Sequence, residues 1–214
     1  MIKKFLSDSA FIVDNFKIEK FLYSNGFCCV AGCDEAGRGP LAGPVVAACV
    51  HLPLGCDHSI FIDSKVLSAT KRSNLYDSLY RLKADIGIGM VSEREIERLN
   101  IHQASLLAMK KALLNNDAVA IDFLLVDGKF TVPTHVRQEP LIKGESKSAS
   151  IAAASIIAKV KRDRIMKRLH EKFPAYNFAK NKGYPTREHR LAIKNNGPCP
   201  AHRVTFKGVR ECVK

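Results

Sequence analysis

The chain has 214 residues, 46 % of them hydrophobic, which is enough to bury the core of one domain and excludes a disordered protein. No apolar run approaches the roughly 20 residues that span a bilayer, and Asp8 and Asp14 interrupt the apolar start, so we expect no membrane span, no signal peptide and a cytoplasmic location. The whole net charge of +13 falls in the last third: residues 1–142 carry 16 basic and 16 acidic side chains and residues 143–214 carry 18 and 5, which favours nucleic acid as the partner.

The first third of the chain is predicted to contain a short helix and two strands. The helical lead-in ends near Asn25, before the turn signal of Gly26, and β-favouring runs follow at residues 27–33 and 45–51. The connection between these runs is rich in glycine, and we call residues 37–44 the glycine loop. Because glycine has no Cβ, this loop is able to bring backbone N–H groups close to a phosphate.

Two adjacent carboxylates, Asp34 and Glu35, stand between the first predicted strand and the glycine loop. Like charges at contact distance repel, so one of them takes up a proton or a cation lies between them. A divalent metal is the strongest candidate for that cation. The loop begins with Gly37, Arg38 and Gly39, so acids suited to a metal stand beside a cradle for a phosphate, and this arrangement predicts phosphodiester chemistry.

The middle of the chain alternates predicted helices and strands. Periodicity and composition predict a helix at 68–83, a strand at 86–91, helices at 92–100 and 101–114, and a strand at 121–126. Ser92 and Glu95 have the spacing of a capping box. The last of these strands delivers Asp127 at its end. Sites in open α/β sheets are built where strands end, so we expect Asp127 to join Asp34 and Glu35.

The last third is predicted to be helical and basic. A long helix spans 148–172 and a shorter one spans 186–196, where Gly197 is the stop signal. The long helix turns an apolar face to the sheet, and its outward side carries a basic row: Lys159, Lys161, Arg162, Arg164, Lys167 and Arg168. Asp163 lies within this row. We interpret it as the ion-pair partner of Lys159 or Lys167, with support of a metal site as the alternative.

Aromatic and basic residues alternate after the long helix, and Tyr184 among them is a candidate stacking platform in a nucleic-acid groove. We expect two parts of the chain: an α/β catalytic domain, residues 1–172, and a small basic helical appendage, residues 173–214, packed on it.

The seven cysteines show neither metal spacing nor disulfide pairing. Cys28, Cys29 and Cys33 crowd one stretch, and no C-x-x-C occurs. We interpret the cysteines as small buried side chains on strands in a reducing compartment. The histidines are scattered without ligand spacing and are interpreted as surface or packing residues.

Four carboxylates are the candidate metal ligands: Asp34, Glu35, Asp127 and Glu145. Glu145 precedes a helix, where an acid also favours the helix dipole, so a purely local role is the alternative. Hard oxygen ligands suit Mg²⁺ or Mn²⁺, and two such ions about 4 Å apart support in-line displacement at phosphorus. The glycine loop also matches G-x-G-x-x-A, but a strand follows where a dinucleotide-binding fold requires a helix, so this reading is set aside.

Several blocks of sequence stand out along nearly the whole chain. Two are long: Asp-Glu-Ala-Gly-Arg-Gly-Pro-Leu-Ala-Gly-Pro-Val at residues 34–45 and Ser-Ile-Ala-Ala-Ala-Ser-Ile-Ile-Ala-Lys at residues 150–159. The shorter ones are Asp63-Ser64-Lys65, Leu125-Val126-Asp127-Gly128, Lys143-Gly144, Arg162-Asp163, Gly183-Tyr184-Pro185-Thr186 and His202-Arg203. In composition and order these blocks resemble the bacterial ribonuclease HII family, the type 2 ribonucleases H.

The resemblance implies an α/β fold of the RNase H-like kind, a mixed sheet flanked by helices with a small helical C-terminal appendage. It implies endonucleolytic hydrolysis of the RNA strand of RNA/DNA hybrids. It also implies cleavage 5′ of single ribonucleotides embedded in duplex DNA, which leaves 3′-hydroxyl and 5′-phosphate ends and serves ribonucleotide excision repair. We expect a monomer acting on these substrates.

The resemblance also implies roles for named residues. The four carboxylates would coordinate two divalent ions, Mg²⁺ or Mn²⁺. The first three residues of the glycine loop, Gly37, Arg38 and Gly39, would read the 2′-hydroxyl that distinguishes RNA from DNA. Tyr184 would pack on the deoxyribose just past the ribonucleotide, and Lys65 and Lys147 would contact the nucleic acid.

The chain departs from the family pattern at two positions. Glu145 stands where the family usually has Asp, and Val66 stands where it usually has a second Lys after Lys65. Two other functions stay open at this point. One is a catalytically silent binder of RNA/DNA hybrids, which the change at Glu145 permits. The other is a nuclease of different substrate class, such as a DNA junction resolvase, against which the glycine loop and Tyr184 argue.

Overall fold

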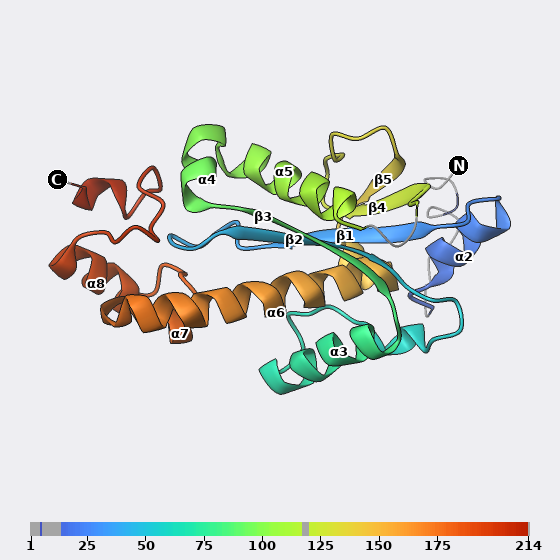
Figure 1. Ribbon diagram of the computed structural model, residues 1–214, viewed down its shortest axis with the longest axis horizontal. Coiled ribbons are helices and arrows are strands. Elements are labelled where there is room, and N and C mark those ends of the chain that lie inside the picture. Colours follow the sequence, from blue (N-terminus) through green and yellow to red (C-terminus); the bar gives the residue numbers. More distant parts are fainter. Residues whose placement is uncertain (1–4, 6–13, 117–119, 214) are drawn as a thin grey trace.

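A mixed five-stranded sheet forms the centre of the molecule (Figure 1). The computed structural model describes residues 5, 14–116 and 120–213. The strands are β1 (Val30–Ala36), β2 (Val45–His51), β3 (Asp85–Val91), β4 (Phe123–Asp127) and β5 (Arg137–Leu141), and they lie in the order β3-β2-β1-β4-β5. β1 pairs antiparallel with β2 and parallel with β4, so it is the strand at which the antiparallel and parallel halves of the sheet meet. The predicted α/β class with a mixed sheet is confirmed.

Helices cover both faces of this sheet. They are α2 (Lys17–Ser24), α3 (Ala69–Arg81), α4 (Glu93–Leu99), α5 (Ile101–Leu114), α6 (Ala149–Lys172), α7 (Phe178–Asn181) and α8 (Arg187–Asn196), with 3-10 turns η1 (His58–Ile60), η2 (Gly144–Ser146), η3 (Pro174–Tyr176) and η4 (Arg210–Cys212). α3 and α6 lie on one face, and α4 and α5 lie on the other (Figure 1). The capping box predicted at Ser92 and Glu95 opens α4.

The first strand begins and ends later than predicted. β1 starts at Val30 instead of residue 27, and it continues through Asp34 and Glu35 to Ala36. The N–H groups of Cys28 and Cys29 donate to the Asp122 carboxylate and not to a neighbouring strand. Pairing with β2 extends to Ala36, so contact with the neighbour, and not local composition, sets where the strand ends.

Strand β5 was not predicted from the sequence. It is short, partly exposed, and has the sequence Arg-Gln-Glu-Pro-Leu. Of the described strands only β4 pairs with it, so it forms one edge of the sheet. A proline is compatible with an edge strand because no second neighbour needs its missing N–H. Because of its polar residues and its proline, the segment lacks the alternation of hydrophobic and polar residues that predicts a strand.

The long helix α6 packs directly on the centre of the sheet. Its first half is buried and rich in alanine, and it crosses β1 at Gly32. A Cβ at Gly32 would lie 2.2 Å from the backbone nitrogen of Ile151, so only glycine permits this approach. The predicted apolar face of the helix is therefore the face that meets the sheet.

One residue of the predicted basic row lies inside the protein. Arg162 was expected on the outward side of α6, but it is 1 % exposed. Its guanidinium donates to the carbonyl oxygens of Ala42, Pro44 and Lys182. The glycine loop and the segment around Lys182 cover this turn of the helix, which periodicity within the helix could not reveal.

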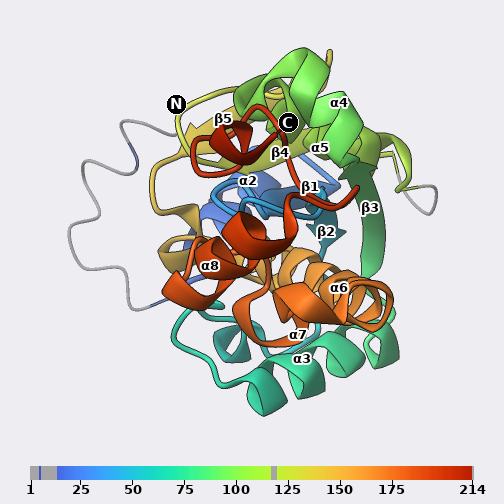
Figure 2. The same cartoon turned by 90° about the vertical axis from the view of Figure 1, so that its left-hand side faces the viewer.

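Residues 173–213 pack around the far end of α6. A hydrophobic cluster joins Met166 of α6 and Leu41 of the glycine loop to Phe178, Ile193 and Val209. Figure 2 looks onto this end, where α7, α8 and the C-terminal segment gather. α8 starts at the Thr186 cap, as predicted, and ends at Gly197 with φ of +72°.

The cysteines only partly follow their interpretation. All seven are free thiols, and Cys33 and Cys49 are buried on β1 and β2 as expected. Cys28 is exposed, because it precedes β1 on the surface instead of lying within the strand. In the part of the chain that the structure describes, no helix is both long and apolar enough to cross a membrane.

Candidate active site

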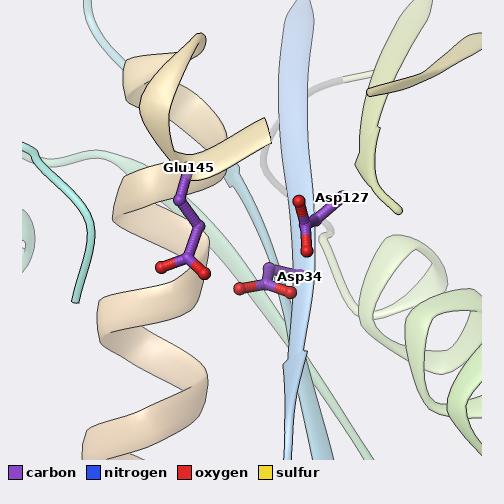
Figure 3. Close-up of side chains that lie close together, drawn as sticks. All are labelled: Asp34, Asp127 and Glu145. Atoms are coloured by element: carbon purple, nitrogen blue, oxygen red, sulfur yellow. The ribbon is translucent and has the colours of Figure 1, made fainter. Parts of the chain in front are cut away.

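Three of the four predicted carboxylates converge from separate elements (Figure 3). Asp34 lies on β1, Asp127 ends β4, and Glu145 belongs to the η2 turn before α6. β1 and β4 are parallel neighbours, so their C-terminal ends meet at one edge of the sheet. Each of the three side chains offers an oxygen atom, and these atoms lie within 4.8 Å of one another.

The Gly144 peptide links two of these acids. Asp127 Oδ1 accepts a hydrogen bond from the Gly144 N–H at 2.7 Å. A Cβ at Gly144 would lie 2.6 Å from Ile151 Cδ1 and 3.1 Å from Asp127 Oδ1, so a side chain does not fit there. The glycine before Glu145 therefore has a physical role: it lets the turn approach β4 closely.

Ser64, Ser155 and Lys65 hold the Glu145 carboxylate. Its Oε2 accepts from the Ser64 N–H at 3.2 Å and from the Ser155 hydroxyl at 2.9 Å. The Lys65 ammonium forms an ion pair with Oε1. Lys65, predicted to contact nucleic acid, therefore lies at the site and contacts a candidate ligand. Only the short Asp-Ser-Lys block signalled the part played by Ser64.

The carboxylates are charged groups in a buried place. Burial, together with Glu35, Asp127 and Glu145, raises the pKa of Asp34 well above its usual value of 3.8. Burial also raises the pKa of Asp127, against the lowering effect of the Gly144 N–H. Among the described residues no lysine or arginine pairs directly with Asp34 or Asp127. The hard oxygen atoms of Asp34 and Asp127 have no such cation beside them, which fits Mg²⁺ or Mn²⁺, so these two residues together with Glu145 would hold such an ion.

Glu35 lies beside this cluster and not within it. It follows Asp34 on β1, and successive side chains of a strand point to opposite faces. Its Oε1 accepts from the Arg38 guanidinium at 3.2 Å. Burial raises the pKa of Glu35 to about 7, although Arg38 acts in the opposite direction.

A hollow of about 500 Å³ lies over the carboxylates and contains most of the predicted site. It is lined by Asp34, Glu35, Ala36, Gly37, Arg38, Gly39, Ser64, Lys65, Arg72, Asp127, Glu145, Ser155, Lys159 and Tyr184. Tyr184 is 44 % exposed, and its ring lies 3.8 Å from the position of a Cβ at Gly39. Lys147 follows η2 and does not line this hollow.

Two cations at the hollow were not predicted as site residues. Lys159 and Arg72 both line it, and both pair with Asp163, at 2.7 and 3.8 Å. The predicted ion pair between Asp163 and Lys159 is confirmed. Lys159 was predicted only as a member of the basic row, as a partner of Asp163 and as the last residue of the block at 150–159, whereas Arg72, on a different helix, had no sequence signal.

The fold has solved counterparts among ribonucleases H. The ribonuclease H2 of Pyrococcus horikoshii OT3 superposes with a TM-score of 0.71 and 25 % identity, over 86 % of this chain and 97 % of that one. Bst-RNase HIII, solved in complex with Mn²⁺, shares the fold with a TM-score of 0.65 and 18 % identity, over 89 % of this chain and 70 % of that one. Fold and acidic site together define a type 2 ribonuclease H, a hydrolase.

Sequence relatives narrow this class to one family. The family model of ribonuclease HII matches residues 31–209. The ribonuclease HII of Desulfotalea psychrophila is 57 % identical over 94 % of this chain and 90 % of its own length. The chain belongs to the ribonuclease HII family. This assignment supports cleavage of the RNA strand of RNA/DNA hybrids, and it decides against both the silent binder and the junction resolvase.

Proposed function

We propose that this enzyme also cuts duplex DNA at single embedded ribonucleotides. It hydrolyses the phosphodiester bond on the 5′ side of the ribonucleotide and leaves a 3′-hydroxyl and a 5′-phosphate. The observation that carries this proposal is the position of the Tyr184 ring over Gly39 at the hollow that holds the carboxylates. An exposed ring beside a glycine backbone suits one sugar that carries a 2′-hydroxyl, followed by one that does not.

The proposed roles follow from the lining of the hollow. Asp34, Asp127 and Glu145, with Glu35 beside them, hold two divalent ions, Mg²⁺ or Mn²⁺. When bound, such ions activate a water and stabilise the leaving oxygen in an in-line displacement at phosphorus. Lys65 and Ser64 orient the Glu145 carboxylate for this task.

Binding of the substrate falls to the glycine loop and the basic side chains. Gly37, Arg38 and Gly39 meet the 2′-hydroxyl, and Tyr184 packs on the next deoxyribose. Lys65 and Lys147 lie near enough to the turn carrying Glu145 to meet neighbouring phosphates. Residues 173–214 act as a basic appendage that packs on the catalytic domain, residues 1–172, and adds phosphate contacts.

We further propose that the enzyme works as a monomer in ribonucleotide repair. The substrate needs one hollow, and all the proposed contacts come from one chain. DNA of a bacterial cell lies in the cytoplasm, so the enzyme acts there. Light scattering in solution at micromolar concentration tests the monomer directly, and a mass of twice 23.7 kDa would contradict it.

The decisive experiment uses a DNA duplex with a single ribonucleotide in one strand. We expect one cut 5′ of the ribonucleotide with Mg²⁺ or Mn²⁺, no cut in EDTA, and no cut with Asp34→Asn. An all-DNA duplex of the same sequence is the control. Cleavage of a continuous RNA/DNA hybrid without cleavage at the single ribonucleotide would refute the proposal while leaving the family activity intact.

A further inference from the structure

Arg203 belongs to the C-terminal segment, yet its guanidinium lies under the glycine loop. The residue is 0 % exposed. It donates five hydrogen bonds of 2.6 to 3.0 Å, all to carbonyl oxygens of the loop: those of Gly37, Arg38, Pro40 and, twice, Gly43. No ion pair joins it to a carboxylate of the described residues. Burial lowers the pKa of Arg203 to about 9, which shows how unfavourable this place is for a cation.

These hydrogen bonds decide which way the loop's peptide groups face. In a trans peptide the C=O of one residue and the N–H of the next point in opposite directions. The carbonyls of Gly37 and Arg38 point inward to Arg203, so the N–H groups of Arg38 and Gly39 point away from it. Neither N–H donates a hydrogen bond to the part of the chain that the structure describes. Both residues line the hollow, and Arg203 does not.

A second guanidinium holds the other end of the loop. Arg162 of α6 donates at 3.0 Å to the carbonyls of Ala42 and Pro44. A Cβ at Gly37 would lie 2.2 Å from Arg162 Nε, so the loop begins against the same side chain. Arg162 also donates to the Lys182 carbonyl, two residues before Tyr184. The two arginines therefore hold the glycine loop and the Tyr184 segment in one arrangement.

We propose that Arg203 is a positioning residue for substrate selection. It holds the carbonyl groups of the loop inward, so that the free N–H groups of Arg38 and Gly39 face the sugar of the ribonucleotide. Arg203 is itself buried and touches no substrate. The identity of the group that the loop reads, a 2′-hydroxyl, rests on the proposed function. Without Arg203 the loop's peptide planes rotate, and the bound ribonucleotide no longer lies in line with the carboxylates.

Two substitutions test this role. Arg203→Lys keeps the charge but offers one nitrogen in place of the guanidinium fork, and Arg203→Gln removes the buried charge and keeps one donor group. With the single-ribonucleotide duplex we expect kcat to fall about 10- to 100-fold. We expect KM to stay unchanged, because the exposed basic side chains still bind the duplex. Arg98→Lys is the matched control, since that arginine is exposed on α4 and does not line the hollow.

Hydrogen exchange supplies a readout that does not depend on activity. Peptides covering residues 37–44 should exchange faster in both Arg203 variants, while peptides of α3 and β3 exchange as in the wild type. Wild-type kcat together with wild-type exchange in the loop would overturn the proposal. So would uniformly faster exchange with kcat falling only in step with the folded fraction. If one variant does not fold, the other carries the test.

The same experiment separates this inference from the proposed function. If the wild type does not cut the single ribonucleotide, the proposed function fails. The role of Arg203 is then judged by exchange in the loop and by kcat on a continuous RNA/DNA hybrid. A normal kcat on the hybrid, with normal exchange in the loop, would overturn the role of Arg203 in that case also.

Discussion

Asp34 is 5 % exposed, and the groups that act on its charge most strongly after burial are three other carboxylates. Among the residues that the structure describes, its Oδ1 accepts a hydrogen bond only from the N–H of Glu35, at 2.7 Å. The folded chain therefore holds Asp34 in a place that disfavours its ionised form. Such a place suits a residue whose partner is a cation that arrives from solution.

Asp34→Asn should stabilise the protein in the absence of metal. The pKa of Asp34 is raised in the folded state, so the unfolded chain loses this proton at a lower pH than the folded chain does. The folded state is consequently penalised as the pH rises above the usual 3.8, whereas an asparagine carries no such penalty. In EDTA at pH 8 we expect the free energy of unfolding to rise by about 1–3 kcal/mol.

Urea denaturation measures this difference. At pH 4 the variant's advantage in free energy of unfolding should shrink, because Asp34 is then protonated in the folded state and partly protonated in the unfolded state. Addition of Mg²⁺ should stabilise the wild type more than the variant. A variant less stable than the wild type in EDTA at pH 8 would contradict the reasoning.

The length of the Glu145 side chain determines where its carboxylate lies. Glu145 meets Ser64, Ser155 and Lys65 on one side and the other acids on the other. Glu145→Asp withdraws the carboxylate by one methylene and cannot keep both sets of contacts. We expect the kcat of this variant with Mg²⁺ to be about tenfold below that of the wild type. The kcat of Glu145→Gln, which also lacks the charge, should be lower still. Equal kcat values for Glu145→Asp and the wild type would contradict a role for the length of the side chain at position 145. Glu171→Asp is the control, because Glu171 is exposed.

At the scale of elements, the site depends on how closely α6 approaches β1. The helix carries Ser155 and Lys159 to the hollow, and the strand carries Asp34. Glycine at position 32 permits the contact, since Ser150 and Ile151 backbone atoms lie where its Cβ would be. The alanine-rich first half of α6 completes the close packing. Separation of these two elements would move Asp34 away from Ser155 and Lys159.

Gly32→Ala should therefore destabilise the fold. The added methyl group would lie 2.2 Å from helix backbone, which cannot move aside as a flexible side chain would. We expect the free energy of unfolding to fall by about 3 kcal/mol. Gly55→Ala, where nothing lies within 4 Å of the new Cβ, should be neutral. Equal midpoints of denaturation for the two variants would contradict this account of the helix–strand contact.

At the scale of the whole molecule, charge and chemistry occupy different parts of the chain. The acids come from β1, β4 and η2, whereas the excess of positive charge follows residue 142. Buried members of that basic set hold the glycine loop in place, as Arg162 and Arg203 do. The exposed members remain available for phosphates. Affinity for the duplex and placement of the scissile bond are therefore separable.

Lys167→Gln tests this separation. Lys167 is exposed on α6, one turn beyond Asp163 and on the side that carries Lys159 to the hollow. Loss of one phosphate contact should reduce the magnitude of the slope of log binding constant against log salt concentration by about 0.9. The kcat at saturating substrate should stay unchanged. Fluorescence anisotropy with a labelled hybrid measures the slope, and Lys20→Gln on α2 is the control. An unaltered slope would place Lys167 outside the binding surface.

The sequence by itself determined the class of the fold, the family and the acids that meet. Strands β2 and β4 and helices α5, α6 and α8 follow from patterns within a few residues of one another. Asp34 and Asp127 were identified because each follows a hydrophobic run. Parallel neighbouring strands bring such positions together, so a local pattern carried information about a distant contact.

Only the tertiary structure decided what holds these groups in place. Arg203 and Gly37 are separated by 166 positions, and no periodic pattern in the sequence predicts the hydrogen bond between them. Arg162 looked like a surface residue because helical periodicity records the face of a helix, not what another segment lays over it. The edge strand β5 and the support of Glu145 by Ser64 have the same origin. Contacts between distant segments form only after the chain has folded, and these contacts set the geometry of the site.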